Sequence, residues 1–293
     1  MSCIAFAGLG RMGLPMCTRL AGAGFDVAAT DLRRELRQDV RSAGADWAPS
    51  IAAAAAGADF LVTMLPGPDE VAAVIPEATA SLAPGSCWID MSSASPPVAR
   101  AIAGAAGPRG LSVVDAPVGG GPDAAGTGRL LVFAGGEDDS LQRCATVFDA
   151  LAERVLHVGP GGSGYAVKLL VNALWFTQAV AGAEVLTLGR RAGLDLDVLL
   201  GALNQSAAVS RFLAQDASAL LDGDDKTTFS LSRCCEELSS VLALGAELEV
   251  ELDVFSAVTG VHLSALERYG DVDGELLGAR LVAERAGVEL GHG

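Results

Sequence analysis

The chain has 293 residues, of which 51% are hydrophobic, and it carries a formal net charge of −16 at pH 7. This length and apolar content are enough for one large domain or for two ordinary domains, each with a hydrophobic core of its own. Because the basic residues form no cluster, the composition argues against a protein that binds nucleic acid or an anionic membrane, and it favours a small-molecule substrate.

Neither a membrane span nor a zinc site is predicted. The longest stretch without charged residues, 169–183, is shorter than the ~20 apolar residues that a span needs, and Asn172 and Gln178 interrupt it. The stretch "MSCIAFAGLG" has neither the basic segment nor the cleavage site of a secretory leader. The 6 cysteines include no CxxC pair, and the 3 histidines are isolated. We therefore expect a cytoplasmic protein without a bound metal.

Short apolar runs alternate with helical segments through the first half of the chain. Buried strands are predicted at 3–10, 27–31, 59–66, 87–92 and 111–118. Each run is followed by a turn or a helical pattern, as at 11–24, where the helix stops at glycine. This alternation predicts an α/β fold with a doubly wound parallel sheet of the Rossmann type. Two further runs, 129–136 and 154–159, are interpreted as antiparallel strands added at the sheet edge.

The second half of the chain shows helical patterns and no strand pattern. Helices are predicted at 165–193, 196–205, 232–250, 254–270 and 275–287. The glycine-rich stretch "HVGPGGSG" therefore marks a boundary between a Rossmann domain, 1–161, and an all-α domain, 162–293. The first helix is long and joins the two domains. Because it is apolar on most faces, it needs cover from the second domain or from a partner subunit.

The clearest chemical motif is "GLGRMG", which comprises Gly8, Leu9, Gly10, Arg11, Met12 and Gly13. It follows a predicted strand and opens a helix, and Asp31 closes the next strand about 20 residues later. Gly8 allows a tight turn, Gly10 lets the backbone approach a pyrophosphate, and Gly13 lets helix and strand pack closely. An ordinary glycine-rich turn is the alternative, but the spacing and the acidic residue favour dinucleotide binding.

Asp31 also favours NAD over NADP. A carboxylate at this place accepts hydrogen bonds from both ribose hydroxyls of NAD, and it repels the 2′-phosphate of NADP. Arg33 and Arg34 follow closely. They could reach such a phosphate, or they could lie solvated in the first helical turn. We expect NAD as the cofactor, with NADP the less favoured alternative.

A lysine stands on the apolar helix that follows the glycine-rich boundary. Lys168 and Lys226 are the only lysines in the chain. Lys168 and Asn172 are four residues apart, so they share one helix face. An amine beside a carboxamide can hold a substrate hydroxyl and move its proton, and burial lowers the pKa of an amine toward neutrality. A lysine stem lying along the core, with its charge in water, is the alternative.

Five segments in order carry a resemblance over nearly the whole chain. They are "GLGRMGLPM" at 8–16, "VTMLPGPDEV" at 62–71, "IDMSSASP" at 89–96, "DAPVGGG" at 115–121 and "GSGYAVKLLVN" at 162–172. They resemble the β-hydroxyacid dehydrogenases, a family that includes 3-hydroxyisobutyrate dehydrogenase. The resemblance implies an N-terminal Rossmann domain, a C-terminal helical domain and an active site in the cleft between them. It also implies a homodimer or homotetramer that associates through the helical domain.

The resemblance assigns roles to individual residues. The family pattern GxGxxxKxxxN is matched by Gly162, Gly164, Lys168 and Asn172, which makes the lysine and the asparagine the catalytic residues. The other expected binding residues are Leu65 and Pro66 along the adenosine side of the cofactor, Ser93 at the nicotinamide and the substrate, and Gly119, Gly120 and Gly121 at the substrate.

Two places depart from the family pattern. Gly119 replaces a serine, which removes one hydroxyl donor. The late motif FxxxLxxKDL reads "FSLSRCCEEL" at 229–238, so Glu236 replaces the lysine and Glu237 the aspartate. Glu236 would then belong to the substrate site, where its charge would disfavour simple anions and favour a zwitterionic substrate. If the alignment is shifted by one helical turn, Glu236 is instead a surface residue.

We predict an NAD-dependent oxidoreductase that transfers a hydride between nicotinamide and a small β-hydroxy acid, or the corresponding aldehyde or ketone. An imine or semialdehyde reductase on the same fold is an alternative, but related imine reductases usually lack the lysine found here at Lys168. Oxidative decarboxylation of a phosphorylated sugar acid, as by 6-phosphogluconate dehydrogenase, would need a longer helical domain. A dinucleotide-binding interaction protein without turnover is the alternative of another class, and Lys168 with Asn172 disfavours it.

Overall fold

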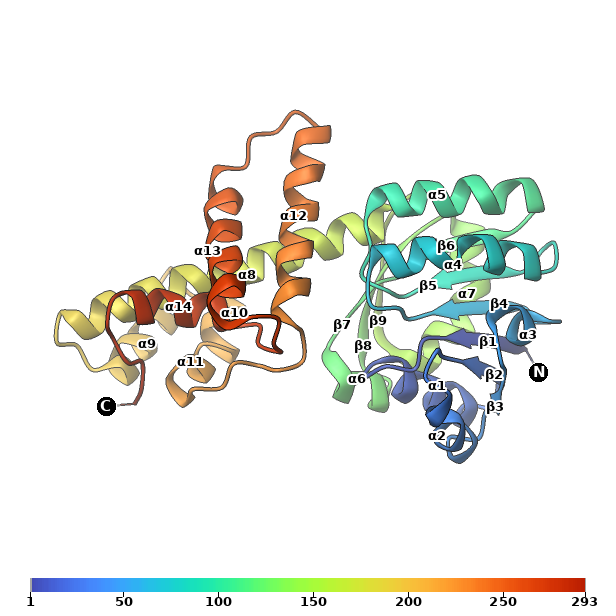
Figure 1. Cartoon of the computed structure of the whole chain (residues 1–293), viewed down its shortest axis with the longest axis horizontal. Helices are drawn as coiled ribbons and strands as arrows, with labels where there is room; N and C mark the ends of the chain where they lie inside the picture. Colours follow the sequence, from blue (N-terminus) through green and yellow to red (C-terminus); the bar gives the residue numbers. More distant parts are fainter. Residues whose placement is uncertain (1, 293) are drawn as a thin grey trace. The chain divides into compact units, whose positions relative to one another are not determined.

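The computed structural model describes residues 2–292, which form two compact units that divide between Lys168 and Leu169 (Figure 1). Unit 1 ends at Lys168 and contains a sheet with helices on both faces, whereas unit 2 begins at Leu169 and is helical. The predicted fold class, a doubly wound α/β domain followed by an all-α region, is confirmed.

Unit 1 contains a nine-stranded sheet. Its strands are β1 (Cys3–Ala7), β2 (Asp26–Thr30), β3 (Asp46–Trp47), β4 (Phe60–Thr63), β5 (Cys87–Asp90), β6 (Ser112–Asp115), β7 (Val118–Gly119), β8 (Leu130–Gly135) and β9 (Ala152–Gly159). The spatial order is β3-β2-β1-β4-β5-β6-β8-β7, and β9 pairs with β8. Because β1 lies between β2 and β4, the direction of winding reverses there, and ligands of such sheets bind at this point.

Helices cover both faces of this sheet (Figure 1). They are α1 (Gly13–Gly22), η1 (Arg34–Leu36), α2 (Arg37–Ser42), α3 (Ile51–Ala55), α4 (Pro68–Ser81), α5 (Pro96–Ala106), η2 (Gly107–Arg109), α6 (Gly121–Thr127) and α7 (Asp138–Leu151). Ile4 and Phe6 of β1 face the core formed with α1, α2, α6 and α7. Ala5 and Ala7 face the core formed with α3, α4 and α5. Burial on both faces explains why the strands are apolar runs without a polar alternation.

Most of the strand predictions are confirmed. The five expected parallel strands are β1, β2, β4, β5 and β6, and the two expected additions are β8 and β9. β8 runs antiparallel to β6, and β9 runs parallel to β8, so both oppose the central strands. β3 and β7 are two residues long and were not predicted, because so short a segment has no readable periodicity.

Unit 2 is built around one long helix. Its helices are α8 (Ser163–Arg191), which begins in unit 1, α9 (Leu196–Asn204), α10 (Arg211–Gln215), α11 (Ser218–Asp222), α12 (Leu231–Glu247), α13 (Asp253–Tyr269) and α14 (Leu277–Arg285). α12 and α13 form an antiparallel pair (Figure 1). Leu238, Val241 and Val258 from this pair are buried with Phe176 of α8. The five long predicted helices are all present, and the short α10 and α11 were not predicted.

By length and composition, α8 is apolar enough to cross a membrane. Leu169, Ala173, Phe176 and Val180 of this helix nevertheless pack into the core of unit 2, so it serves as the central helix of that unit. Another set of its apolar side chains is exposed, namely Leu170, Val171, Leu174, Val185 and Leu188. The expected association through a partner subunit is not tested by this structure and stays a prediction.

Candidate active site

The turn between β1 and α1 accepts only glycine at two positions. Gly8 has a φ of +95°, and a Cβ added to it would lie 2.3 Å from the carbonyl oxygen of Met64. A Cβ on Gly13 would lie 1.9 Å from the carbonyl oxygen of Gly8. A Cβ on Gly10, by contrast, meets no atom within 4 Å. The turn is therefore closed on the protein side and open at its middle glycine.

This turn fits the pyrophosphate of a dinucleotide. α1 begins at Gly13, and no side chain caps its N-terminus. Backbone N–H groups at such an end attract phosphate oxygens, and the helix dipole adds to this attraction. Leu9 is buried in the core, Met12 packs against it, and Arg11 is exposed. The motif thus anchors itself with two apolar side chains and leaves the open face at Gly10 for the cofactor.

Asp31 follows directly after β2 and binds the same turn. Its carboxylate accepts a 2.7 Å hydrogen bond from the backbone N–H of Leu9. Arg33 donates to it from the backbone N–H at 2.8 Å and from Nε at 3.0 Å. Burial opposes ionisation, but the hydrogen bonds from Arg33 and Leu9 prevail and hold the pKa of Asp31 below its usual value. The carboxylate is therefore ionised at neutral pH, as an acceptor for ribose hydroxyls must be.

A second loop reaches the same edge of the sheet after β4. The backbone N–H of Leu65 donates to Oγ of Ser92 at 2.8 Å, and the N–H of Ser92 donates to Asp90 at 2.7 Å. Ser92 is buried, while Ser93 and Leu65 are half-buried and Pro66 is exposed. Ser92 therefore holds the two predicted cofactor segments together. Sequence reasoning selected its neighbour Ser93 and missed this role.

Asp90 and Tyr165 are buried beneath that loop. Asp90, at the end of β5, is fully buried, and burial raises its pKa to about 6 although the hydrogen bonds from Ser92 oppose the shift. Burial, together with the nearby charge of Asp90, raises the pKa of the Tyr165 hydroxyl. A buried carboxyl is costly unless it is hydrogen-bonded, so its contact with Ser92 accounts for its place here.

The glycines predicted to bind substrate lie at the β7–α6 junction. Gly120 and Gly121 have φ values of +118° and +70°, in the left-handed region that favours glycine. A Cβ on Gly119 meets no atom within 4 Å. Gly119 therefore leaves open space at the position where the family pattern has a serine.

Asp115 fixes the beginning of α8. Its carboxylate accepts hydrogen bonds from the backbone N–H groups of Gly162 at 2.7 Å and of Tyr165 at 3.0 Å. A Cβ on Gly164 would lie 2.4 Å from the carbonyl oxygen of Phe133. The helix that carries Lys168 therefore starts in direct backbone contact with the sheet. Burial raises the pKa of Asp115 to about 6, against the effect of these hydrogen bonds.

Lys168 and Asn172 lie one helical turn apart on α8, and both are half-buried. Nδ2 of Asn172 donates to Oε2 of Glu237 at 2.6 Å. Glu237 lies on α12 and is 8% exposed. In the sequence, Glu237 was noted only because it replaces the aspartate of a family motif. In the structure it is the hydrogen-bond partner of a predicted catalytic residue.

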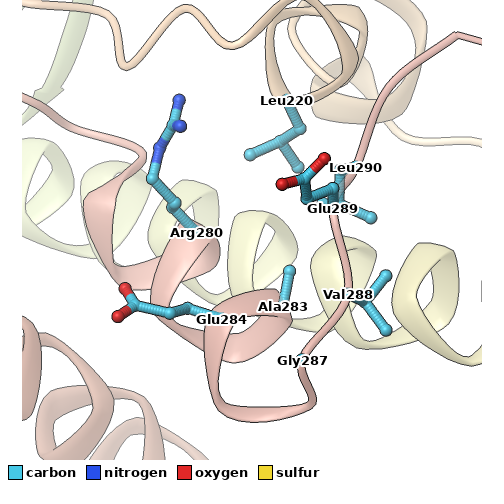
Figure 2. A pocket seen from close by; sticks show the side chains of 8 residues that line it. All are labelled: Leu220, Arg280, Ala283, Glu284, Gly287, Val288, Glu289 and Leu290. Carbon is cyan, nitrogen blue, oxygen red and sulfur yellow. The ribbon is translucent and has the colours of Figure 1, made fainter.

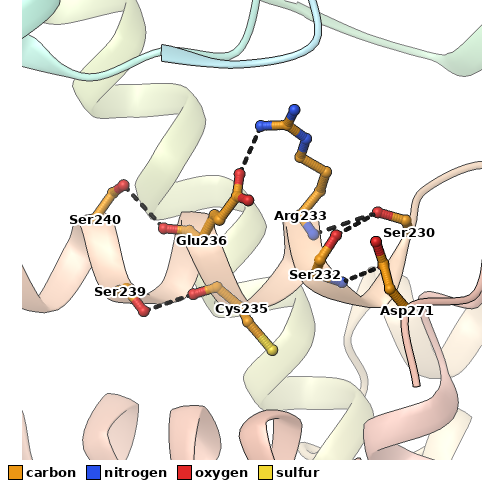
Figure 3. Close-up of polar contacts among 8 residues, drawn as sticks. All are labelled: Ser230, Ser232, Arg233, Cys235, Glu236, Ser239, Ser240 and Asp271. Atoms are coloured by element: carbon orange, nitrogen blue, oxygen red, sulfur yellow. Dashed lines mark hydrogen bonds and ion pairs between the residues drawn. The ribbon is translucent and has the colours of Figure 1, made fainter. Parts of the chain in front are cut away.

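Glu236, the neighbour of Glu237 on α12, lies at the surface. Its carboxylate is half exposed and lies 2.6 Å from Nη1 of Arg233, one turn earlier on the same helix (Figure 3). The charge of Glu236 is therefore paired with a guanidinium. Glu236 does not share the buried contact of Glu237 with α8.

Two family models match this chain. Residues 3–159 match the NAD binding domain of 6-phosphogluconate dehydrogenase, and residues 162–277 match the NAD-binding domain of NADP-dependent 3-hydroxyisobutyrate dehydrogenase. The chain is 36% identical over 210 residues to an NAD-dependent L-serine dehydrogenase from Pseudomonas aeruginosa, covering 71% of this chain and 70% of that protein. It is 34% identical over 213 residues to a probable 3-hydroxyisobutyrate dehydrogenase from Mycobacterium tuberculosis, covering 71% and 72%. The chain belongs to the β-hydroxyacid dehydrogenase family.

The likeness extends to the fold of this dehydrogenase. A solved structure of the 3-hydroxyisobutyrate dehydrogenase of Mycobacterium tuberculosis with L-serine is similar with a TM-score of 0.89 and 27% identity, covering 96% of this chain and 99% of that one. The predicted family is therefore confirmed, and with it an NAD(P)-dependent oxidoreductase that acts on hydroxyl groups.

The predicted binding residues of this dehydrogenase gather at one edge of the sheet in unit 1. Asp31, Leu65 and Ser93 all follow the carboxyl ends of parallel strands, as the β1–α1 turn does. Lys168 and Asn172 lie together on α8. Three supporting residues were not predicted, and they are Ser92, Asp115 and, as a contact of Asn172, Glu237.

A pocket of about 630 Å³ in unit 2 is lined by none of these residues. Figure 2 shows its lining, which comes from α11, α14 and the segment after α14. Arg280 in its wall is bound to Asp225 at 2.6 Å, and Glu284 is bound to Arg268 and Tyr269. Because these charged groups already bind other residues of the protein, the pocket is not a candidate for the active site.

Proposed function

We propose that this dehydrogenase oxidises a β-hydroxy acid that carries an amino group, with NAD as the hydride acceptor. The start of α8 carries this proposal, because it presents Lys168 and Asn172 from a helix anchored to the sheet by Asp115. The dinucleotide turn and Asp31 support the choice of an NAD-linked reaction.

Bound NAD would supply the hydride acceptor, and the protein side chains would handle the proton. In oxidation, Nζ of Lys168 takes the proton of the substrate hydroxyl, and in reduction it returns that proton to the carbonyl oxygen. Asn172 orients the hydroxyl toward the amine. The backbone at Gly119, Gly120 and Gly121, with Ser93, receives the acid group of the substrate.

Three observations support a substrate with an amino group. α12 carries two neighbouring carboxylates, Glu236 and Glu237, where the family pattern has one lysine and one aspartate. Because Arg233 pairs with Glu236, the two carboxylates and the guanidinium leave one net negative charge on this part of the helix, and this charge attracts an ammonium group and disfavours a simple anion. The L-serine dehydrogenase relative acts, by its name, on a hydroxy acid of this kind. Open space at Gly119 adds volume for a larger substituent.

The preference for NAD rests on Asp31. Its ionised carboxylate is held beside the dinucleotide turn by Leu9 and would repel a 2′-phosphate. Arg33 is bound to that carboxylate, so its guanidinium is engaged by Asp31. NADP would have to bind against this arrangement.

We also propose a cytoplasmic homodimer, or a homotetramer built from it, joined through α8. Leu174 and Leu188 are 52% and 71% exposed, and Leu170 and Val171 add to the same apolar set. Large exposed apolar patches of soluble proteins mark interfaces. Leu174→Glu should therefore shift the molecular mass in light scattering toward the monomer, and an unchanged mass would count against an interface at this residue.

The substrate proposal is tested by following NADH formation with L-serine and 3-hydroxyisobutyrate, each with NAD and with NADP. We expect the highest kcat/KM with L-serine and NAD, and Glu236→Lys should raise kcat/KM for 3-hydroxyisobutyrate. Equal efficiency of wild type with both acids would reject the amino-group proposal. If wild type binds NADH and turns over neither acid nor any member of a hydroxy-acid panel, the non-catalytic binding protein becomes the better interpretation.

A further inference from the structure

We propose that Glu237 is a positioning residue that fixes the side-chain amide of Asn172 in one orientation, with its carbonyl oxygen available to orient the amine of Lys168 toward the substrate hydroxyl. This inference rests on the proposed function, because it assigns a task to the residue that would orient the substrate hydroxyl. The task follows from three features of the contact between α8 and α12.

The first feature is the polarity of the contact. Nδ2 of Asn172 lies 2.6 Å from Oε2 of Glu237. An ionised carboxylate has only acceptors, so the side-chain nitrogen of Asn172 must face it. A bond of this length from an amide to a carboxylate is charge-assisted and stronger than a bond between neutral partners. An amide that could otherwise rotate by half a turn therefore has one preferred orientation.

The second feature is the burial of Glu237. It is 8% exposed and lies between Glu236, which is exposed, and Leu238, which is buried in the core shared with α8. A carboxylate on this inward face costs free energy unless its oxygens are hydrogen-bonded, and an apolar side chain would avoid that cost. Glu236 shows the ordinary surface arrangement on the same helix, with Arg233 as its partner. Packing alone therefore does not explain why Glu237 is buried, and its contact with Asn172 offers a reason.

The third feature is the place of Asn172 on α8. Lys168 lies one turn earlier, so an acceptor on Asn172 and an amine on Lys168 face the same reacting group. Oδ1 and Nδ2 point to opposite sides of the amide, so binding Nδ2 at α12 turns Oδ1 away from Glu237. The one proton of the substrate hydroxyl goes to the lone pair of Nζ in oxidation. Oδ1 in this orientation is an acceptor for an N–H of the Lys168 amine, and a hydrogen bond of this kind would direct the Nζ lone pair toward the substrate hydroxyl.

The test uses Glu237→Gln, which keeps the size of the side chain and removes the charge. A glutamine amide can either donate to or accept from Asn172, so the fixed orientation is lost. We expect kcat to fall about 10- to 100-fold, the scale of a misplaced catalytic contact, with KM for NAD unchanged. Glu247→Gln, at an exposed position at the C-terminal end of the same helix, is the matched control and should leave kcat near that of wild type with L-serine.

A double-mutant cycle separates positioning from a structural effect. In an Asn172→Ala background, Glu237→Gln should lower kcat by less than about 2-fold, because there is no amide left to orient. Glu237→Asp, which restores a carboxylate on a shorter stem, should recover part of the lost activity. If Glu237→Gln costs as much in the Asn172→Ala background as in wild type, Glu237 does not act through Asn172 and the proposal is overturned.

An NMR measurement, which needs no turnover, tests the hydrogen bond between Asn172 and Glu237 directly. In ¹⁵N-labelled full-length protein, the side-chain amide of Asn172, assigned by its loss in Asn172→Ala, should be shifted downfield and protected from solvent exchange. Both properties should be lost in Glu237→Gln and kept in Glu236→Gln. An ordinary, freely exchanging Asn172 amide in wild type would refute the fixed orientation. If the amide behaves as expected but wild type turns over no hydroxy acid, the proposed function fails and the orienting contact stands.

Discussion

Replacing Gly10 by alanine should separate cofactor binding from folding. The added Cβ meets no atom of the protein within 4 Å, and the φ of Gly10 lies outside the left-handed region. The folded state should therefore tolerate it, and stability should stay level or rise by about 0.4–1 kcal/mol, because alanine restricts the unfolded chain. The same Cβ occupies the face where a pyrophosphate must approach the backbone.

Gly13→Ala provides the contrasting case. Its Cβ would lie 1.9 Å from the carbonyl oxygen of Gly8, whereas ordinary contacts between carbon atoms are about 3.5–4.0 Å. α1 and the turn would have to separate, which places the cost near the top of the ~1–3 kcal/mol range for overpacking. Alanine regains about 1 kcal/mol of helix propensity over glycine. A net loss of about 2 kcal/mol is expected.

The two variants are compared by urea unfolding and by titration of NADH fluorescence, with Gly22→Ala at the end of α1 as a control that also meets no atom within 4 Å. Gly10→Ala should unfold like wild type and bind NADH at least about 10-fold more weakly, which is about 1.4 kcal/mol. Gly22→Ala should bind NADH like wild type and unfold at the same or a higher urea concentration, because alanine favours the helix. NADH binding by Gly10→Ala that equals wild type would refute a pyrophosphate over this turn.

Three further predictions concern charged residues. Lys168→Ala should lower kcat by ~10²–10⁴ at unchanged NADH affinity, and Lys226→Ala, which removes an ion pair with an aspartate 3.0 Å away, should leave kcat intact. Asp31→Ala should lower the ratio of kcat/KM for NAD over NADP by at least about 10-fold, because it removes the repulsive carboxylate and releases Arg33. Asp90 has a pKa of about 6 in the folded state against 3.8, so the native state binds its proton more tightly and stability falls as pH rises from about 4 to about 6. The free energy of unfolding, measured with urea across this pH range, should fall less in Asp90→Asn than in wild type, by up to about 3 kcal/mol. An identical pH dependence of the two proteins would contradict the assignment.

Local sequence signals predicted much of the fold and the dinucleotide turn. Glycine at Gly8 and Gly13 is required by backbone approaches within one β–α unit, and the motif reports those approaches directly. Strands buried on two faces appear as apolar runs, and long helices show their period over several turns. These features depend on neighbours in sequence, which is why the sequence predicted them. β3, β7, α10 and α11 are too short to show a period.

The supporting contacts of the site could not be predicted in the same way. The partners Leu65 and Ser92 are 27 residues apart, Gly162 and Asp115 are 47 apart, and Asn172 and Glu237 are 65 apart. A single serine or acid in a sequence does not reveal which distant backbone group or amide it will meet. The signal that was present is chemical: Asp90 and Asp115 end apolar strands, where a buried carboxyl must have a hydrogen-bond partner.

Asp115 gives these contacts a common physical meaning. It ends β6, just before the loop with the three glycines that are predicted to bind the substrate, and its carboxylate holds the N-terminus of α8. The position of the predicted substrate loop and that of the helix with Lys168 therefore both depend on Asp115. Gly164 allows this because a side chain there would meet the carbonyl oxygen of Phe133 at 2.4 Å. The glycines before Lys168 thus set where the helix that carries this predicted catalytic residue begins, because they permit a close contact with the sheet.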